Sequence, residues 1–389
     1  MAPPSQGRPR VTSLDALAES LGRTGARLLL EAPGRAPLAI GQPPHRARVT
    51  FHESSAVRSL EQRDLLAVAE AHLRAEIDVT GDFREVMKLT EVIAPGPTAW
   101  ERLRFASQLL LRDRRSLQRE SVAFHYDRPP EFFLPWFERW RSYSHGLYEA
   151  SDDAPEAAQA RKLARAVEAL GLAPGMHVFD MGCGWGSFLE YAGLRGIRVH
   201  GITISEEQHR FVSRLIREQR LPCTVERVDL LDHWPEQPYD GAVFMGTFEH
   251  FSDYPHAARF LAAHLRPGAR VWADFCSERE GFQVGAFLAR HVFPGTARYV
   301  DVPALLGALI RAGFNVHELA DDTLSYAWTC RDWAAALERD QKALAERFGE
   351  ESVRAFRVFL RASEHFLETN RTQAYHLVAG LAPREAQRG

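Results

Sequence analysis

The stretch Val178-Phe179-Asp180-Met181-Gly182-Cys183-Gly184-Trp185-Gly186 decides the fold of this chain. An apolar run that includes an acidic residue leads into glycines at alternate positions, and a helix is predicted to begin at about Ser187. Glycine is needed where the backbone turns sharply or approaches a ligand without a Cβ in the way. A dinucleotide-binding turn has the spacing GxGxxG, whereas this turn has GxGxG. The stretch therefore predicts a strand, a ligand-binding turn and a helix, with a purely structural turn as the alternative.

Short apolar strands alternate with helical segments around and beyond this turn. The predicted strands are His177–Met181, Val199–Ile204, Thr224–Val228, Gly241–Phe244 and Val271–Phe275. This alternation is typical of βαβ units, in which helices cover both faces of a parallel sheet. We therefore expect an α/β fold with ligands bound at the carboxyl ends of its strands.

Polar residues follow the next two strands at that same edge. Thr203 lies at the end of the second strand, Ser205 and Gln208 follow it, and Asp229 and Leu230 follow the third. At this edge they can contact a ligand, and Asp229 could read an adenine amino group. Ser205 and Gln208 also match a helix capping box, and the two interpretations are compatible.

The first half of the chain is predicted to hold a separate small domain. Residues 1–12 are expected to be unordered, and residues 13–95 to form a small α+β domain. Its predicted elements are a helix at Leu14–Leu21, a hairpin of Ala26–Leu30 and Leu38–Ile40, a strand at Arg48–Phe51 and a helix at Leu60–Leu73. Two prolines around Gly96 end it, because they cannot continue a helix. A linker and helical lid should occupy residues 96–165, and the α/β domain with late helices residues 166–389.

Composition and charge exclude several classes of protein. The 48 basic and 51 acidic residues leave a net charge of −3, which provides no footprint for nucleic acid. Only Lys88, Lys162 and Lys342 are lysines, and the arginine excess runs through the whole chain, which indicates compositional bias. The four cysteines show no metal-ligand spacing, so no metal site is expected. We expect a cytoplasmic protein, because neither a signal peptide nor a membrane-spanning stretch is present.

Four segments together resemble one known family. They are His125-Tyr126-Asp127 with Phe132-Phe133, then Tyr143-Ser144, then the glycine turn with Gly201–Gln208, and then Phe248-Glu249-His250-Phe251. Over residues 120–330 the chain resembles the cyclopropane-fatty-acyl-phospholipid synthases and the related mycolic acid methyltransferases. The resemblance implies S-adenosylmethionine as cofactor. It also implies a Rossmann-like class I methyltransferase fold with a mostly parallel seven-stranded sheet, helical lid insertions and a small N-terminal α+β domain.

The resemblance also assigns cofactor and lid residues one by one. Tyr143 and Ser144 would lie near the methionine carboxylate. The residues assigned beneath or around the rest of the cofactor are Asp180, Gly182, Gly184, Gly186, Thr203, Ser205, Gln208, Asp229 and Leu230. The residues assigned to the lid that meets the substrate are His125, Tyr126, Phe132, Phe133 and Trp136. Trp136 at helical spacing also suits a core position.

Family chemistry requires a base after methyl transfer to an acyl double bond. In the family, a bicarbonate ion held by Cys, Glu, His and Tyr side chains takes the proton that lets the cyclopropane close. Here Glu249 is present, but His145 stands in place of the cysteine and Ala273 in place of the histidine, while Asp321 aligns with the tyrosine. Asp321 would repel an anion, so bicarbonate is doubtful. We predict Glu249, His145 and Asp321 as the catalytic set, with His145, oriented by Glu249, as the candidate base.

The expected function is C-methylation of the double bond of an unsaturated acyl lipid. The product could be a cyclopropane, or a methyl or methylene branch if the acyl chain loses the proton. One alternative is N-methylation of a small amine, which needs no bicarbonate, and another is a lipid- or cofactor-binding protein without catalysis. His145 could instead merely fill the cysteine's space, and Glu249 could cap a helix. Peripheral contact with the inner face of the membrane and a homodimer stay open.

Overall fold

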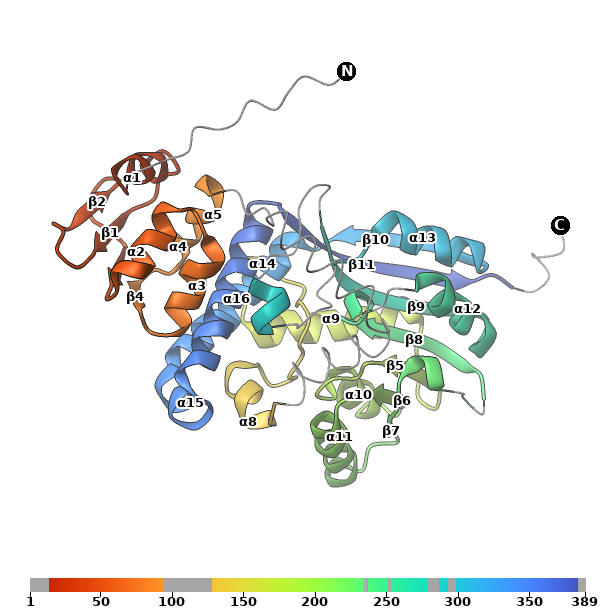
Figure 1. Ribbon diagram of the computed structural model, residues 1–389. Coiled ribbons are helices and arrows are strands. Elements are labelled where there is room, and N and C mark those ends of the chain that lie inside the picture. Colours follow the sequence, from red (N-terminus) through yellow and green to blue (C-terminus); the bar gives the residue numbers. More distant parts are fainter. Residues whose placement is uncertain are drawn as a thin grey trace, which may run out of the picture.

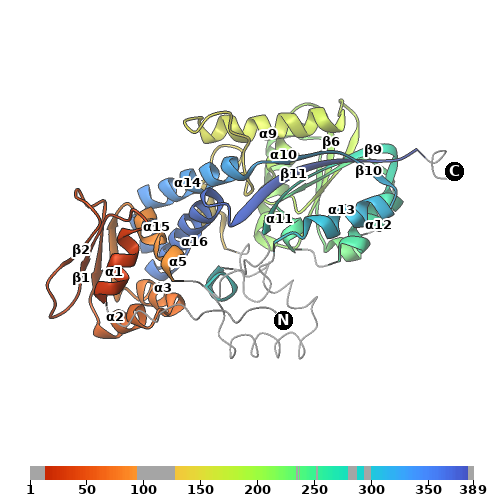
Figure 2. The ribbon, with the colours of Figure 1, turned by 90° about the horizontal axis from the view of Figure 1, so that it is seen from above.

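The computed structural model describes residues 14–93, 128–233, 235, 237–250, 253–278, 287–292 and 299–383. Within them the chain forms an N-terminal domain on a four-stranded sheet and a larger domain on a seven-stranded sheet (Figure 1). Both views place the C-terminal helices between the two sheets (Figures 1 and 2). These are α14 (Thr323–Arg339), α15 (Gln341–Phe348) and α16 (Glu350–Glu368). No helix of the described residues is long and apolar enough to cross a membrane.

The large sheet has the strand order β10-β11-β9-β8-β5-β6-β7. Its parallel strands are β5 (His177–Met181), β6 (Arg198–Thr203), β7 (Thr224–Arg227), β8 (Tyr239–Met245) and β9 (Leu265–Glu278). β11 (Thr372–Leu381) runs antiparallel to both β9 and β10 (Phe314–Asp321). The expected mostly parallel seven-stranded sheet is confirmed. β8 and β9 extend beyond the ranges that their apolar runs predicted.

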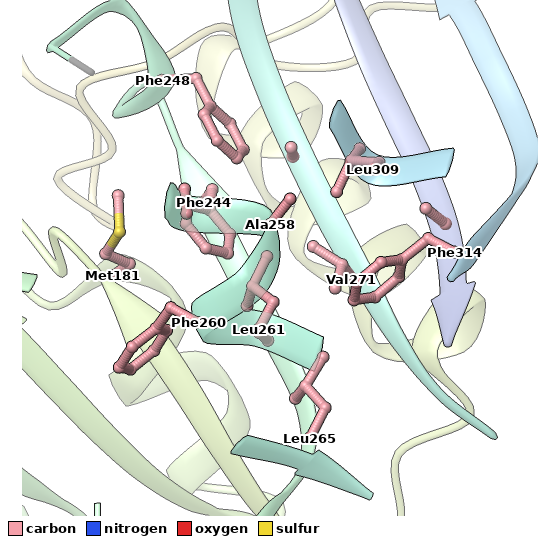
Figure 3. Close-up of a cluster of buried hydrophobic side chains, with 14 of the residues drawn as sticks. Met181, Phe244, Phe248, Ala258, Phe260, Leu261, Leu265, Val271, Leu309 and Phe314 are labelled. Atoms are coloured by element: carbon pink, nitrogen blue, oxygen red, sulfur yellow. The ribbon is translucent and has the colours of Figure 1, made fainter. Parts of the chain in front are cut away.

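Helices cover both faces of this sheet. α9 (Pro155–Leu170), α10 (Ser187–Gly193) and α11 (Glu206–Gln219) pack in one buried cluster, and α12 (Tyr254–His264) and α13 (Val302–Arg311) in another. Figure 3 shows Phe244 of β8 and Leu261 of α12 inside the second cluster. The predicted domain boundary between residues 165 and 166 is wrong, because it falls inside α9, whose apolar face packs against β9.

The N-terminal domain has the strand order β2-β1-β3-β4. Its strands are β1 (Leu28–Glu31), β2 (Leu38–Ile40), β3 (Ala47–Phe51) and β4 (Ile77–Gly81), and its helices are α1 (Leu14–Gly22), α2 (Ser54–Glu61), α3 (Leu65–Leu73), α4 (Arg84–Met87) and α5 (Leu89–Val92). The predicted hairpin of β1 and β2 is confirmed. The single helix predicted over Leu60–Leu73 is wrong, because Arg63 adopts φ 61° and Asp64 caps a new helix through the Ala67 N–H.

Arginine side chains join the N-terminal domain to α16. Arg354 has 12% of its side chain exposed and donates hydrogen bonds to the carbonyl oxygens of His72 (3.0 Å) and Ile77 (3.1 Å) and to Asp78 (2.7 Å). Arg357 lies over the ring of Phe83, 4.5 Å from its centroid. The guanidinium suits such contacts because it offers five N–H donors in a planar fork. Part of the arginine excess therefore holds the two domains together.

We expect the substitution Arg354→Met to lower the free energy of unfolding by about 2–3 kcal/mol, because it removes a charge-assisted hydrogen bond to Asp78 and the hydrogen bonds to the carbonyl oxygens of His72 and Ile77. Urea unfolding measures the change. The exposed Arg23, whose pair with Glu19 lies at the surface, provides the control. Arg23→Met should cost about 0.5 kcal/mol or less, and equal losses in the two variants would contradict the assignment.

Candidate active site

The glycine turn at the end of β5 has the backbone geometry that only glycine adopts easily. Gly182, Gly184 and Gly186 have φ angles of 74°, 53° and 79°. A Cβ on Gly182 would lie 2.3 Å from Cγ2 of Thr247, which follows β8. The turn therefore brings its backbone against the neighbouring strand end, and the predicted strand, turn and helix are confirmed.

Asp180 and Asp274 lie buried beneath this turn. Burial and the nearby Asp274 carboxylate raise the pKa of Asp180 to about 7. One carboxyl oxygen of each side chain is buried without a hydrogen-bond partner. These orphaned acceptors at the edge where ligands bind are suited to the polar groups of a nucleoside-containing cofactor.

The polar residues at the end of β6 and just after it are bonded to one another. The Thr203 hydroxyl donates to Oε1 of Gln208 at 2.7 Å, and the Gln208 N–H donates to the Ser205 hydroxyl at 3.3 Å. The cap interpretation of Ser205 is thus confirmed, although the Gln208 side chain bonds to Thr203 instead of completing a capping box. Asp229 is half-buried after β7, and Leu230 is buried in the core. The cofactor roles of these five residues stay predictions.

A segment around Tyr143 and Ser144 lies against the end of β8. A Cβ on Gly246 would lie 3.1 Å from Cβ of Ser144 and 3.4 Å from the carbonyl oxygen of Tyr143. Lys162 of α9 is fully buried and donates to the Ser142 (2.9 Å) and Ser144 (2.7 Å) hydroxyls. Its ammonium also lies 3.8 Å from the Asp274 carboxylate. These contacts hold the Tyr143–Ser144 segment beside the glycine turn.

Sequence reasoning missed Lys162, although the sequence contained a signal. Lys162 occupies the apolar stripe of α9 between Ala158 and Ala166, where a charged side chain is out of place. A lysine inside an apolar helix face needs polar partners supplied by another segment. The serines at positions 142 and 144 are those partners.

Glu249 lies in a buried polar cluster with residues of β9 and α14. Its Oε1 accepts the backbone N–H of Cys276 at 2.7 Å, and its Oε2 is buried without a hydrogen-bond partner. Burial raises the pKa of Glu249 to about 8, so the carboxyl is mostly protonated at neutral pH. Tyr326 of α14 hydrogen-bonds to Cys276. The Glu249 carboxyl therefore fixes the backbone of β9 at Cys276. These contacts do not support the alternative in which Glu249 caps a helix.

His145 is bonded to Asp322, which was not among the predicted site residues. Its Nε2 lies 2.9 Å from Oδ2 of Asp322, and the same oxygen lies 2.6 Å from Nδ1 of His376. Burial disfavours the charge of Asp322, but the hydrogen bonds from the two histidines outweigh this effect and lower its pKa to about 2. The Nδ1 atom of His145 is buried and has no hydrogen-bond partner. The prediction that Glu249 orients His145 is therefore corrected, because Asp322 does so.

Two assignments made by sequence register are also wrong. Asp321 is exposed and accepts the Thr323 backbone N–H at 2.9 Å, so it turns away from His145, while Tyr326 lies beside that ring at a centroid distance of 5.1 Å. Tyr326, and not Asp321, is therefore the side chain beside His145. Ala273 packs in the core cluster with α12 and α13, since side chains alternate along β9. Asp274, one residue later, faces Lys162.

The lid residues fall into two groups. His125 and Tyr126 lie outside the described residues. Phe132, Phe133 and Trp136, in α8 (Pro130–Phe133) and η1 (Leu134–Trp136), are almost fully buried in an aromatic cluster with α14 and α16. This confirms the core interpretation of Trp136. Contact of these side chains with substrate stays a prediction.

Comparison with known proteins gives this architecture a family. The family model "Mycolic acid cyclopropane synthetase" matches residues 113–377. A cyclopropane mycolic acid synthase, MmaA2, of Mycobacterium tuberculosis is 36% identical over 58% of this chain and 85% of its own length. A probable fatty acid methyltransferase of Pseudomonas putida is 23% identical over 87% of this chain and 88% of its own.

Solved structures show the same fold. The cyclopropane synthase CmaA1, crystallised with S-adenosylhomocysteine (SAH), superposes with a TM-score of 0.63 at 23% identity, over 67% of this chain and 98% of its own. Coclaurine N-methyltransferase superposes with a TM-score of 0.64 at 17% identity, over 81% of this chain and 98% of its own. Fold and glycine turn define a class I S-adenosylmethionine-dependent methyltransferase. The chain belongs to the mycolic acid cyclopropane synthetase family.

We expect Gly182→Ala to weaken SAH binding at least about tenfold, because the added Cβ collides with Thr247 and displaces the turn. Isothermal titration calorimetry measures the affinity. Gly175 is the matched control, since its φ is also positive (85°) but a Cβ there would meet nothing within 4 Å. Equal affinities in the two variants would show that the close contact at Gly182 is not needed.

The buried Glu249 carboxyl should make stability depend on pH. Its pKa is about 8 in the folded chain against an ordinary value of 4.5, so folding binds a proton between these values. Stability should therefore fall as pH rises from about 4.5 to about 8. Glutamine resembles the protonated carboxyl, so the free energy of unfolding of Glu249→Gln, measured with urea, should fall less over this pH range. The exposed control Glu351→Gln should show the same pH dependence as the wild type. Parallel curves for all three proteins would contradict the pKa shift.

Proposed function

We propose that this methyltransferase transfers a methyl group to the double bond of an unsaturated acyl lipid and that His145 removes the proton released afterwards. The buried pair of His145 and Asp322, with its unpartnered Nδ1, is the observation that carries the proposal. Membership of a lipid-modifying family supports the choice of acceptor.

The cofactor supplies an electrophilic methyl group on a positively charged sulfur. Gly182, Gly184 and Gly186 would lie beneath it, because their lack of Cβ atoms leaves the backbone accessible. The buried acceptor of Asp180 and the carboxylate of Asp229 would receive its polar hydrogens. Lys162 would act indirectly by holding Ser144 and Tyr143 in place.

Asp322 determines which nitrogen of His145 can act as the base. A carboxylate with a pKa of about 2 is ionised at neutral pH, so His145 must point an N–H at it through Nε2. In the neutral imidazole the lone pair then lies on Nδ1. This atom is buried and has no hydrogen-bond partner, so its lone pair is available to accept a proton from a substrate.

His376 supports the same arrangement from the other side of Asp322. Burial lowers the pKa of His376, but its hydrogen bonds to Asp322 and Glu318 reverse that effect and raise it. His376 is also stacked on Trp272 at a centroid distance of 4.6 Å. It therefore fixes the carboxylate that orients His145, and the whole group resembles a base with its orienting acid.

The same cluster fits bicarbonate poorly. The lone pair at Nδ1 of His145 offers an anion no donor, and the ionised Asp322 lies directly behind the ring. Lys162, the buried cation nearby, is already engaged by two serine hydroxyls. Direct proton removal by His145 therefore suits this chain better than an anion held in the family's manner.

Aromatic rings beside His145 suit a reaction that passes through a cation. The ring centroid of Tyr326 lies 5.1 Å from that of His145. The ring centroid of Trp333 lies 6.2 Å from that of Tyr326 and 5.4 Å from that of Tyr143. The faces of such rings attract positive charge. In the proposed step the π electrons of the alkene form the new C–C bond as the S–CH₃ bond breaks. Nδ1 then accepts a proton from the transferred methyl group or from the acyl chain. The electrons of the broken C–H bond close a cyclopropane ring in the first case and form a new double bond in the second.

Acceptor assays with purified protein and S-adenosylmethionine test the proposal. SAH release should require vesicles of an unsaturated phospholipid and should not occur with the saturated analogue or without lipid. The lipid should gain one CH₂ in its mass spectrum, and NMR distinguishes a ring from a branch. Release with a small amine but not with lipid would replace the proposal by N-methylation. Absence of release with every acceptor would indicate a binding protein.

Substitution of His145 and Asp322 tests the base. We expect His145→Ala to lower kcat about 10²- to 10⁴-fold with SAH affinity unchanged, because the proton acceptor is lost. Asp322→Asn should also lower kcat, since an amide no longer enforces the tautomer. Asp321→Asn is the matched control and should change kcat less than about threefold, because Asp321 faces solvent. Wild-type turnover with an unchanged pH profile in His145→Ala would overturn the role of His145.

A further inference from the structure

Three side chains at the β6–β7 edge of the large sheet form a cluster that the methyl transfer does not use. His200 comes from β6, Glu226 from β7, and His233 follows η2 (Leu230–Asp232). Oε2 of Glu226 lies 3.6 Å from Nε2 of His200 and 3.3 Å from Nδ1 of His233. One ligand atom from each of the three residues lies within 4.8 Å of the others.

We propose that His200, Glu226 and His233 bind a divalent transition-metal ion of the zinc type. Two imidazoles and one carboxylate are a common donor set for zinc. Zinc bonds of about 2.0–2.2 Å place neighbouring ligand atoms of a tetrahedron roughly 3.3–3.6 Å apart. Both contacts of Glu226 are close to that separation. Its side chain is 53% exposed, which leaves a route for the ion and a position for water.

The far nitrogens of both imidazoles contact one hydroxyl group. Tyr239 of β8 is fully buried, and its hydroxyl lies 3.1 Å from Nδ1 of His200 and 3.1 Å from Nε2 of His233. Metal-binding histidines are usually held through the nitrogen that does not bind the metal. The His233 ring is also stacked on the ring of Phe179, with a centroid distance of 5.4 Å and an angle of 4° between the ring planes. The two rings are thus oriented before any ion arrives.

A proton count at Tyr239 favours a cation between the three groups. The hydroxyl can donate its single proton to only one of the two imidazoles, so with neutral rings the other must donate an N–H to the hydroxyl oxygen. That second ring then presents a bare lone pair to the Glu226 carboxylate. A metal ion removes the conflict, as a proton on the second ring also would, because both rings then turn lone pairs to the ion and N–H groups to the Tyr239 oxygen.

The proposed ion would join three parts of the sheet edge. Glu226 and His233 flank the segment that carries Asp229 and Leu230, and His200 ties that segment to β6. An ion at this site would therefore steady the segment expected to contact adenine. This consequence rests on the proposed cofactor role of Asp229, whereas binding of the ion does not.

Zinc titration of the full chain, purified without a histidine tag and stripped with a chelator, tests the proposal. Calorimetry should show one site with a dissociation constant below about 10 µM, and Mg²⁺ should not compete because imidazole ligands disfavour it. Co²⁺ should give the visible absorption of a four-coordinate ion. Weaker zinc binding, or stoichiometric binding unaffected by the variants below, would overturn it.

Three variants test the site, of which two replace proposed ligands and one replaces Tyr239, which orients them. Glu226→Gln, at an exposed position that folding tolerates, should weaken zinc binding at least about 30-fold, and His233→Gln should do the same. Tyr239→Phe should weaken it about 10- to 100-fold, as expected for a residue that orients a ligand. The exposed Glu218→Gln on α11 is the matched control and should bind as the wild type does. Zinc should raise the Tm of the wild type and Glu218→Gln but not of Glu226→Gln, and this readout is independent of methyl transfer.

Discussion

The close approach of the Gly182 backbone to Thr247 is the contact on which the rest of the site depends. It brings together the ends of β5 and β8, which neighbour each other in the sheet, at a distance that any Cβ would prevent. The Tyr143–Ser144 segment packs on the residue that precedes Thr247, Gly246. The glycine turn, the Tyr143–Ser144 segment and the adjacent His145 are therefore placed by one region of close backbone packing.

A second constraint is the burial of charge around that region. Lys162 and Asp274 lie in an interior where isolated charges are unfavourable, so each needs partners with defined positions. Ser142 and Ser144 provide them for Lys162, and this couples α9 to the segment that precedes His145. Arg354 plays a comparable part at the domain interface, where it satisfies carbonyl oxygens of the N-terminal domain.

Much of the fold was predictable because it depends on local patterns. The strand at His177–Met181, the positive φ angles of its glycines and the N-cap at Ser205 follow from neighbouring residues, and all are present. The helix expected over Leu60–Leu73 was wrong because apolar periodicity continues across Arg63, where the backbone does not. Ala273 was assigned by register alone, and the alternation of side chains along β9 directs it into the core.

The sequence by itself indicated the class of protein, since the glycine turn, the strand pattern and the other segments together resemble one methyltransferase family. It also identified His145 and Glu249 as residues of interest. Only the tertiary structure decided the partner of His145, because Asp322 lies 177 residues away and differs from Asp321 by a single position at the start of α14. Likewise, His200, Glu226 and His233 lack any metal-binding spacing along the chain. The parallel pairing of β6 and β7 brings His200 near Glu226, and the segment after η2 adds His233, whose ring contacts the Tyr239 hydroxyl.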